Sequence, residues 1–281
     1  WKALRIQRLV FVVRIRSEYI YKNHEMINSF PLGDFKGFAP AFYRAPLDND
    51  RNICKYWHTM GLQNTSNICK GSSFTDNGDN IVVTTNIKSI ANCILPVANT
   101  QIKYTIYPNG NILVDVNCLG GGAVKLLPRF GVMLEMPKEY ENIKYFGLGE
   151  DVNLPDYKEH TINKIYQTTV DKLKEDYIKP QESATRCDVR FAEITNASGF
   201  GLRFEAVNKP FIFSASHYTS NQWAKAMHRD DLVDLPTTCV NIDSSVLGAG
   251  SNACGPLPDK KDRVGSLSGK KLSFVVKPIG E

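Results

Sequence analysis

Long apolar runs are missing from this sequence. The longest, such as Leu9–Val13 and Phe274–Val276, are far shorter than the ~20 residues that a membrane-spanning helix needs. A signal peptide is not expected near the start either, because Gln7 and Arg8 interrupt the apolar residues there. The sequence begins at Trp1 rather than at Met, so we expect further chain upstream of this residue. We also expect the protein to be water-soluble and to have no membrane partner.

A large excess of charge of one sign is also missing. The 281 residues include 34 Lys and Arg against 29 Asp and Glu, which gives a formal net charge of +5. Both signs are interspersed along the chain, and no basic stripe with interleaved aromatic residues is present. Nucleic acid is therefore not an expected partner.

The motifs of common metal and catalytic sites are missing as well. The seven cysteines form no close pair of the zinc or redox type and the five histidines are scattered, so we expect no metal site and no cofactor in this chain. The sequence has no G-x-S-x-G elbow and no phosphate-binding loop. The odd number of cysteines favours reduced thiols in a cytoplasmic protein; three disulfides plus one free thiol in a secreted chain are the alternative.

Strand patterns recur about every ten residues, which is typical of sandwiches and barrels. Asn109 and Gly110 supply the tight turn of one predicted hairpin. The predicted hairpins and final strand lie at residues 74–89, at 101–116, around 197–199 and at 271–277. Helical turns are expected only at 173–177 and 220–228. The pattern predicts an all-β fold, a large antiparallel β-sandwich forming a single domain over residues 1–281.

Two arginines stand beside predicted turns. Arg44 precedes a turn that carries Asp48 and Asp50, and a charge in a partly buried turn needs a partner, so we expect Arg44 to pair with one of these aspartates. Arg129 opens a predicted strand and is interpreted as a second structural guanidinium.

A denser charged set and a loop of small residues follow later in the chain. Glu182, Arg186, Asp188 and Arg190 alternate along a predicted strand, and we interpret them as a surface ladder of ion pairs. Residues 248–256 are rich in glycine and other small residues, which allows this loop to lie close against another surface or a ligand.

These segments resemble, in order and spacing, the C-terminal small-chain domain of family 2 β-galactosidases. Residues 42–50 are similar to the family's Phe-Trp-Arg-Ala-Pro-x-Asp-Asn-Asp, with Tyr43 in place of Trp. The further matches are residues 127–131 (Leu-Pro-Arg-x-Gly), the glycine-spaced aromatic run 145–149 followed by Asn153, Pro155 and Asp156, the segment 180–190 that begins Pro-Gln-Glu, and the late loop ending Cys254, Gly255, Pro256.

The resemblance implies a two-sheet super-β-sandwich, similar to the galactose mutarotase fold, docked on a TIM barrel or large subunit. In this family the catalytic carboxylates lie on that barrel, so no catalytic residue is expected here; Mg and Na would also be bound by the barrel. The full enzyme would be a homo-oligomer acting on a β-galactoside. The family's late loop approaches the sugar, which makes Ser251, Asn252 and Cys254 candidate substrate-binding residues. Some members carry a Trp near the position of Cys254.

The sequence departs from the family pattern at several positions, and two other functions stay open. Val152, Leu154, Ala184 and Ala253 replace the family's usual residues at those positions, so the resemblance implies a weakened or altered substrate preference. An aldose 1-epimerase would use a histidine and a carboxylate, for which His160 or His217 with Glu182 are candidates. A stand-alone carbohydrate-binding module would expose Trp57, Trp223 and surface tyrosines as platforms for sugar rings.

Overall fold

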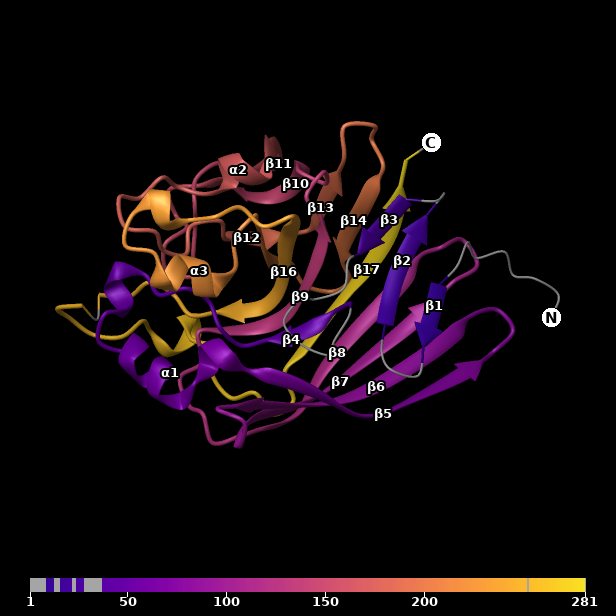
Figure 1. The fold of residues 1–281 in the computed structure, drawn as a ribbon, viewed down its shortest axis with the longest axis horizontal. Helices are drawn as coiled ribbons and strands as arrows, with labels where there is room; N and C mark the ends of the chain where they lie inside the picture. The colour runs from indigo at the N-terminus through magenta and orange to yellow at the C-terminus, as the bar shows by residue number, and fades with distance from the viewer. Residues whose placement is uncertain (1–8, 13–15, 22–23, 28–36, 252, 281) are drawn as a thin grey trace.

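The computed structural model describes residues 9–12, 16–21, 24–27, 37–251 and 253–280, and for the first three of these ranges only the backbone. Figure 1 shows the chain folded mainly into strands, with short helices at one end. The helices are α1 (Cys54–Met60), α2 (Val170–Leu173) and α3 (Ser220–Lys225), and the 3-10 turns are η1 (Asp48–Asp50), η2 (Leu62–Asn64), η3 (Arg229–Asp231) and η4 (Lys260–Asp262).

One sheet has nine strands in the order β11-β10-β13-β14-β17-β8-β7-β6-β5. Its members are β5 (Ser66–Asp76), β6 (Ile81–Ala91), β7 (Leu95–Ile106), β8 (Ile112–Gly121), β10 (Asn142–Gly149), β11 (Ile162–Thr169), β13 (Phe191–Thr195), β14 (Gly201–Ala206) and β17 (Lys271–Ile279). Every pairing in it is antiparallel.

A second sheet has five strands in the order β12-β15-β16-β9-β4, and a small third sheet has the order β1-β2-β3. The five are β4 (Ala39–Ala41), β9 (Arg129–Pro137), β12 (Arg186–Val189), β15 (Phe211–Ser216) and β16 (Thr237–Val246); the three are β1 (Leu9–Val12), β2 (Arg16–Tyr21) and β3 (His24–Ile27). The prediction of an all-β chain built on two large antiparallel sheets is confirmed.

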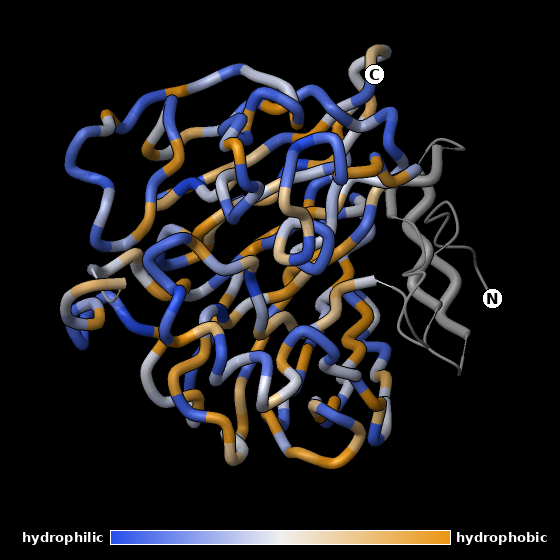
Figure 2. The backbone as a smooth tube through the Cα atoms, turned by 60° about the vertical axis from the view of Figure 1, so that its left-hand side comes forward, coloured by the Kyte–Doolittle hydropathy of each residue, from blue (hydrophilic) through white to orange (hydrophobic). Residues whose placement is uncertain are grey.

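The core lies between the two large sheets because alternate residues of each strand point to it. In the nine-stranded sheet Val114 of β8 lies opposite Phe274 of β17, and both are fully buried. Val132 of β9 and Ile242 of β16 pair in the same way in the five-stranded sheet. In Figure 2 hydrophobic and hydrophilic residues alternate along the strands, as this arrangement requires.

The three predicted hairpins are present. Ile106 pairs with Ile112 across the Asn-Gly turn, β5 and β6 flank the turn after Asp76, and β13 and β14 flank residues 196–200. The helical predictions were partly wrong: the helical turn expected at 173–177 is α2, which ends at Leu173, and α1 was not expected. Helix α1 ends at Met60 and is capped by Gly61, whose φ of 72° suits glycine.

Candidate functional site

Four segments meet at one end of the sandwich, on the left in Figure 1. They are residues 44–52, 150–158, 174–186 and 247–263, and each contains or adjoins one of the motifs recognised in the sequence. Side-chain hydrogen bonds join them over separations of 36 to 203 residues. The tertiary structure therefore gathers the motifs into one region.

Arg44 anchors the first segment from inside. Its side chain is fully buried, and Nη1 lies 2.5 Å from Oδ2 of Asp50, which is also fully buried. The other arm, Nη2, donates to the backbone carbonyl of Leu247 at 3.2 Å, and the guanidinium lies 5.5 Å from the ring centroid of Trp57. Asp50, rather than the exposed Asp48, is the partner, and the same arginine holds the start of the late loop.

The late loop is held by two further side chains. Both carboxylate oxygens of Asp156 accept backbone N–H groups, from Ala249 and Gly250, each at 2.7 Å. Asn49 donates from Nδ2 to the carbonyl of Gly250 at 2.6 Å. A Cβ on Gly248 would lie 2.4 Å from Oδ1 of Asp156, so a glycine is required there for the carboxylate to approach the backbone.

The tip of this loop is exposed. Ser251 and Cys254 both face solvent, while Arg51 donates to the carbonyl of Ala253 at 3.0 Å from the neighbouring segment. Asn252, the third candidate substrate-binding residue, lies outside the described residues. A firmly anchored base with an accessible polar tip is suited to touch a surface or ligand beyond this chain.

A second buried network lies behind the loop. Arg129 Nε is 3.1 Å from Oδ2 of Asp243, close enough for an ion pair although not aligned as a hydrogen bond, and its Nη2 is 3.7 Å from Oε1 of Glu182. All three side chains are at most 3% exposed. Burial raises the pKa of Asp243 to about 7, opposed by Arg129 and reinforced by Glu182. A Cβ on Gly131 would lie 2.2 Å from Oδ1 of Asp243, which explains the glycine of this motif.

The surface ladder expected for the later charged set is wrong. Glu182 and Arg186 are buried, and Glu182 belongs to the Arg129 network. Arg186 binds backbone instead of a carboxylate: its guanidinium donates to the carbonyls of residues 150, 173 and 185 at 2.7 to 3.1 Å. Arg186 thereby links three chain segments, because backbone carbonyl groups in loops need hydrogen-bond donors when they are buried.

Asp188 and Arg190 also have separate surroundings. Asp188 lies 2.7 Å from Nζ of Lys158 and has a φ of 54°, so β12 is irregular here and the four residues do not share a face. Arg190 is exposed, and its guanidinium lies 5.0 Å from the ring centroid of Phe146. Alternation in the sequence could not reveal this break in the strand.

The aromatic and histidine candidates lie elsewhere than expected. Trp57 is fully buried and Trp223 is 4% exposed, so neither is a surface platform for a sugar. His217 is buried, with Nδ1 3.3 Å from the carbonyl of Thr237, and His160 packs on the ring of Tyr157 at a centroid distance of 4.6 Å.

Asp156 and Asp243 were not among the predicted functional residues. For Asp243 a signal was available, since Asn241 and Asp243 alternate with the apolar Val240 and Ile242 within β16. For Asp156 there was none beyond its place in a motif, because its partners are 93 and 94 residues away.

Three further observations concern metal binding, disulfides and membrane spans. Among the described residues, no group of three or more His, Cys, Asp and Glu is arranged to hold a metal ion. All seven cysteines are free thiols, three of them buried, rather than the disulfides of the alternative interpretation. No helix in the part of the chain described is long and apolar enough to cross a bilayer.

Comparisons with known proteins agree with the motifs. The chain is 29% identical over 214 residues to a β-galactosidase of Staphylococcus xylosus and 28% identical over 215 residues to one of Actinobacillus pleuropneumoniae, in each case 76% of this chain. It spans only 21% of the length of these relatives.

Among solved structures, a galactose 1-epimerase from Lactobacillus acidophilus is similar in shape, with a TM-score of 0.41 and 8% identity over 75% of this chain and 66% of that one. A likeness this distant carries no conclusion about function. Residues 16–276 match the family described as "Beta galactosidase small chain", and the chain belongs to that family.

Proposed function

We propose that this chain is the accessory small-chain part of a family 2 β-galactosidase that removes terminal β-D-galactose. It works with a catalytic TIM barrel, on the same protein or on a large subunit, which carries the retaining carboxylate pair and any Mg and Na. The full enzyme assembles as a homo-oligomer in the cytoplasm in this proposal. The family match over residues 16–276, against about a fifth of the relatives' length, is the observation that carries it.

The buried carboxylates of this chain support the absence of catalysis. A retaining glycosidase needs two carboxyl groups about 5 to 5.5 Å apart that reach the glycosidic bond. Glu182 and Asp243 converge on one guanidinium, but both are at most 3% exposed, and Arg129 occupies the space between them. A disaccharide could not approach them without breaking this network. We therefore assign them a structural role.

The late loop supplies the contact to the sugar site in this proposal. Arg44, Asn49 and Asp156 fix its base, so Ser251 and Cys254 are presented at a defined place on the end of the sandwich. With Cys254 in place of a larger aromatic residue, the loop stacks less on the leaving group. Asn252 would supply a polar contact there.

The test uses the chain alone and the longer protein that includes the reading frame upstream of Trp1. The chain alone should not hydrolyse a chromogenic β-galactoside, whereas the longer protein should. Turnover by the isolated chain that is lost in Glu182→Gln would contradict the proposal.

The loop assignment has its own measurement in the longer protein. Substrate or an inhibitor should slow the reaction of Cys254 with a thiol reagent. Cys69 and Cys93 are exposed and serve as matched thiols that should react at an unchanged rate. Cys254→Trp should change the discrimination between leaving groups, while Cys69→Trp should not.

A further inference from the structure

The outer face of the five-stranded sheet is polar yet buried. In register, Ser214 of β15 lies opposite Asn241 of β16, and Cys239 lies opposite Glu135 of β9, so these side chains share one face. Each is at most 8% exposed. The opposite face, with Val240 and its neighbours, packs into the core. A sheet face covered by protein is normally apolar, so this row of polar groups requires an explanation.

Some of these polar atoms have no partner in the protein. Oδ1 of Asn241 and Oε2 of Glu135 are buried without a hydrogen bond. Leaving such a group unsatisfied costs about 1–3 kcal/mol, so these two atoms favour an added polar partner. Burial raises the pKa of Glu135 to about 7, against the opposing hydrogen bonds of Thr237 and Cys239. Near neutral pH the carboxyl can therefore donate as well as accept.

Two neighbouring hollows lie over this face. The inner one, of about 20 Å³, is lined by Ser214, Asn241, Glu182 and others, and holds no more than about one water molecule. The outer one, of about 100 Å³, is open on one side. Tyr218 and Trp223 line both, so they separate the buried polar row from the outer pocket.

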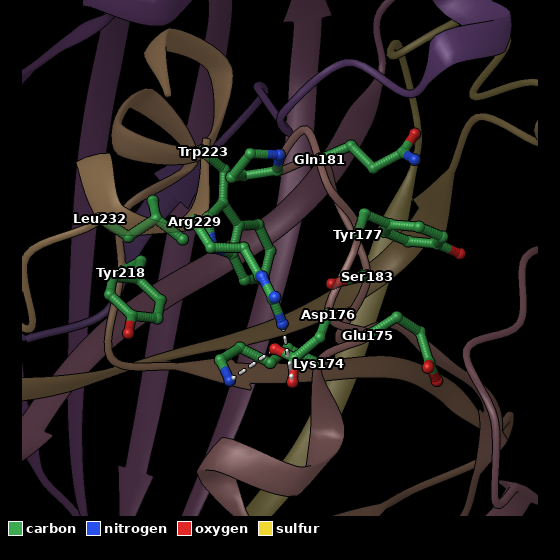
Figure 3. Close-up of a pocket in the computed structure, with 11 residues that line it drawn as sticks. Lys174, Glu175, Asp176, Tyr177, Gln181, Ser183, Tyr218, Trp223, Arg229 and Leu232 are labelled. Atoms are coloured by element: carbon green, nitrogen blue, oxygen red, sulfur yellow. Dashed lines mark hydrogen bonds and ion pairs between the residues drawn. The ribbon is translucent and has the colours of Figure 1, made fainter. Parts of the chain in front are cut away.

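The outer pocket has two walls, which face each other in Figure 3. One wall is the segment 174–183 and the other is the segment 218–232. Rings and apolar side chains from both walls alternate with hydroxyl and amide groups; they are Tyr177, Pro180, Gln181, Ser183, Tyr218, Trp223 and Leu232. Such a mixture binds ligands that have an apolar face and polar edges.

The charges at the rim cancel. Lys174 Nζ lies 3.3 Å from Asp176 Oδ1, and Arg229 Nη1 lies 3.8 Å from Oδ2 of the same residue, as the dashed lines in Figure 3 show. With Glu175 also lining the pocket, two cations face two anions. The rim therefore favours a neutral ligand over a phosphate or an ammonium group.

We infer that this pocket is a second, non-catalytic binding site for one neutral monosaccharide ring, separate from the late loop. A pyranose has C–H faces for the rings of Tyr177 and Tyr218, which are partly exposed at the pocket, and hydroxyls for Gln181 at its edge. The pocket is small and open, so an oligosaccharide would fit with one residue only and affinity is millimolar, on the order expected for few contacts.

The test is an NMR titration of the isotope-labelled chain with D-galactose, with glycerol as a non-ring control. The indole N–H of Trp223 and the amide of Ser183 should shift with saturation. Trp57 is an internal reference, because its Nε1 donates to the carbonyl of Leu126 inside the protein. The readout is independent of β-galactoside hydrolysis, so this inference and the proposed function can fail separately.

Three variants decide the outcome. Ser183→Val and Leu232→Trp fill the pocket from opposite walls, and each should weaken binding at least about tenfold; Leu232 is partly exposed, so its variant remains informative if Ser183→Val fails to fold. Arg229→Ala should change the affinity for galactose less than threefold, since the ligand is neutral. No saturable shift of Trp223 up to 100 mM galactose, on the order of a hundred times the expected constant, would overturn the inference, as would binding unaffected by either filling variant.

Discussion

Replacing Arg44 isolates a negative charge inside the protein. Asp50 is fully buried, and besides Arg44 its Oδ2 accepts only the N–H of Leu47 at 2.8 Å, while Oδ1 has no hydrogen bond. Arg44→Met keeps most of the side-chain volume but removes the cation and its donors to Ala45 and Leu247. The carboxylate then has no counter-charge and no contact with solvent.

The expected cost is about 3–5 kcal/mol of unfolding free energy, the range for breaking a buried ion pair from one side. Asp50→Asn leaves the opposite charge alone and should cost a similar amount. The double variant removes both charges, so it should be less destabilised than the two single changes added together, by roughly 2 kcal/mol or more.

Urea unfolding followed by fluorescence measures this cycle. With a slope of about 3 kcal/mol per molar, Arg44→Met should lower the midpoint by roughly 1 M or more. Arg190→Ala is the matched control, since this exposed arginine only lies over the ring of Phe146 and should cost about 0.5–1 kcal/mol. An unchanged midpoint in Arg44→Met, or strict additivity in the double variant, would refute the buried-pair explanation.

Three further predictions follow from the buried and anchored groups. Because folding raises the pKa of Glu135 from 4.5 to about 7, the folded state binds more protons between these values, and the free energy of unfolding should fall by up to about 3 kcal/mol as pH rises through that range. Glu135→Gln should reduce this pH dependence of the free energy of unfolding and leave only the contribution of Asp243, whose pKa is also raised by burial. Asp156→Ala should speed amide exchange of the late loop about tenfold without moving the global midpoint. In the native chain a thiol reagent should modify Cys254 rapidly, whereas Cys239, whose pKa burial raises, should react only on unfolding.

Each has a control in the same chain. Glu139→Gln, at an exposed position, should keep the native pH dependence, and a Glu135→Gln variant with that same dependence would assign the slope to other groups. Unchanged exchange in Asp156→Ala would show that the loop does not depend on this carboxylate. Equal reaction rates at Cys239 and Cys254 would contradict the burial of the former.

The local pattern of the sequence predicted the strands well, for reasons that depend on near neighbours. Asn109 and Gly110 can form a tight turn wherever they stand, and alternating residues such as Val114, Asp115 and Val116 give a strand one buried face in any sheet. Helix α1 was missed because it is short, lacks a side-chain N-cap and contains residues such as Tyr56 and Trp57 that favour strands.

What the sequence alone determined is the all-β class, the turns and the resemblance that placed the motifs in one family. The tertiary structure decided which charges are buried and with whom they pair. Asp156 meets a loop 94 residues later, and Arg129 meets Asp243, because the order of strands in each sheet brings them together. A residue's own neighbours do not encode that order. It follows from how two whole sheets bury their apolar faces against each other, and only then does a charged residue become either a surface group or a buried anchor.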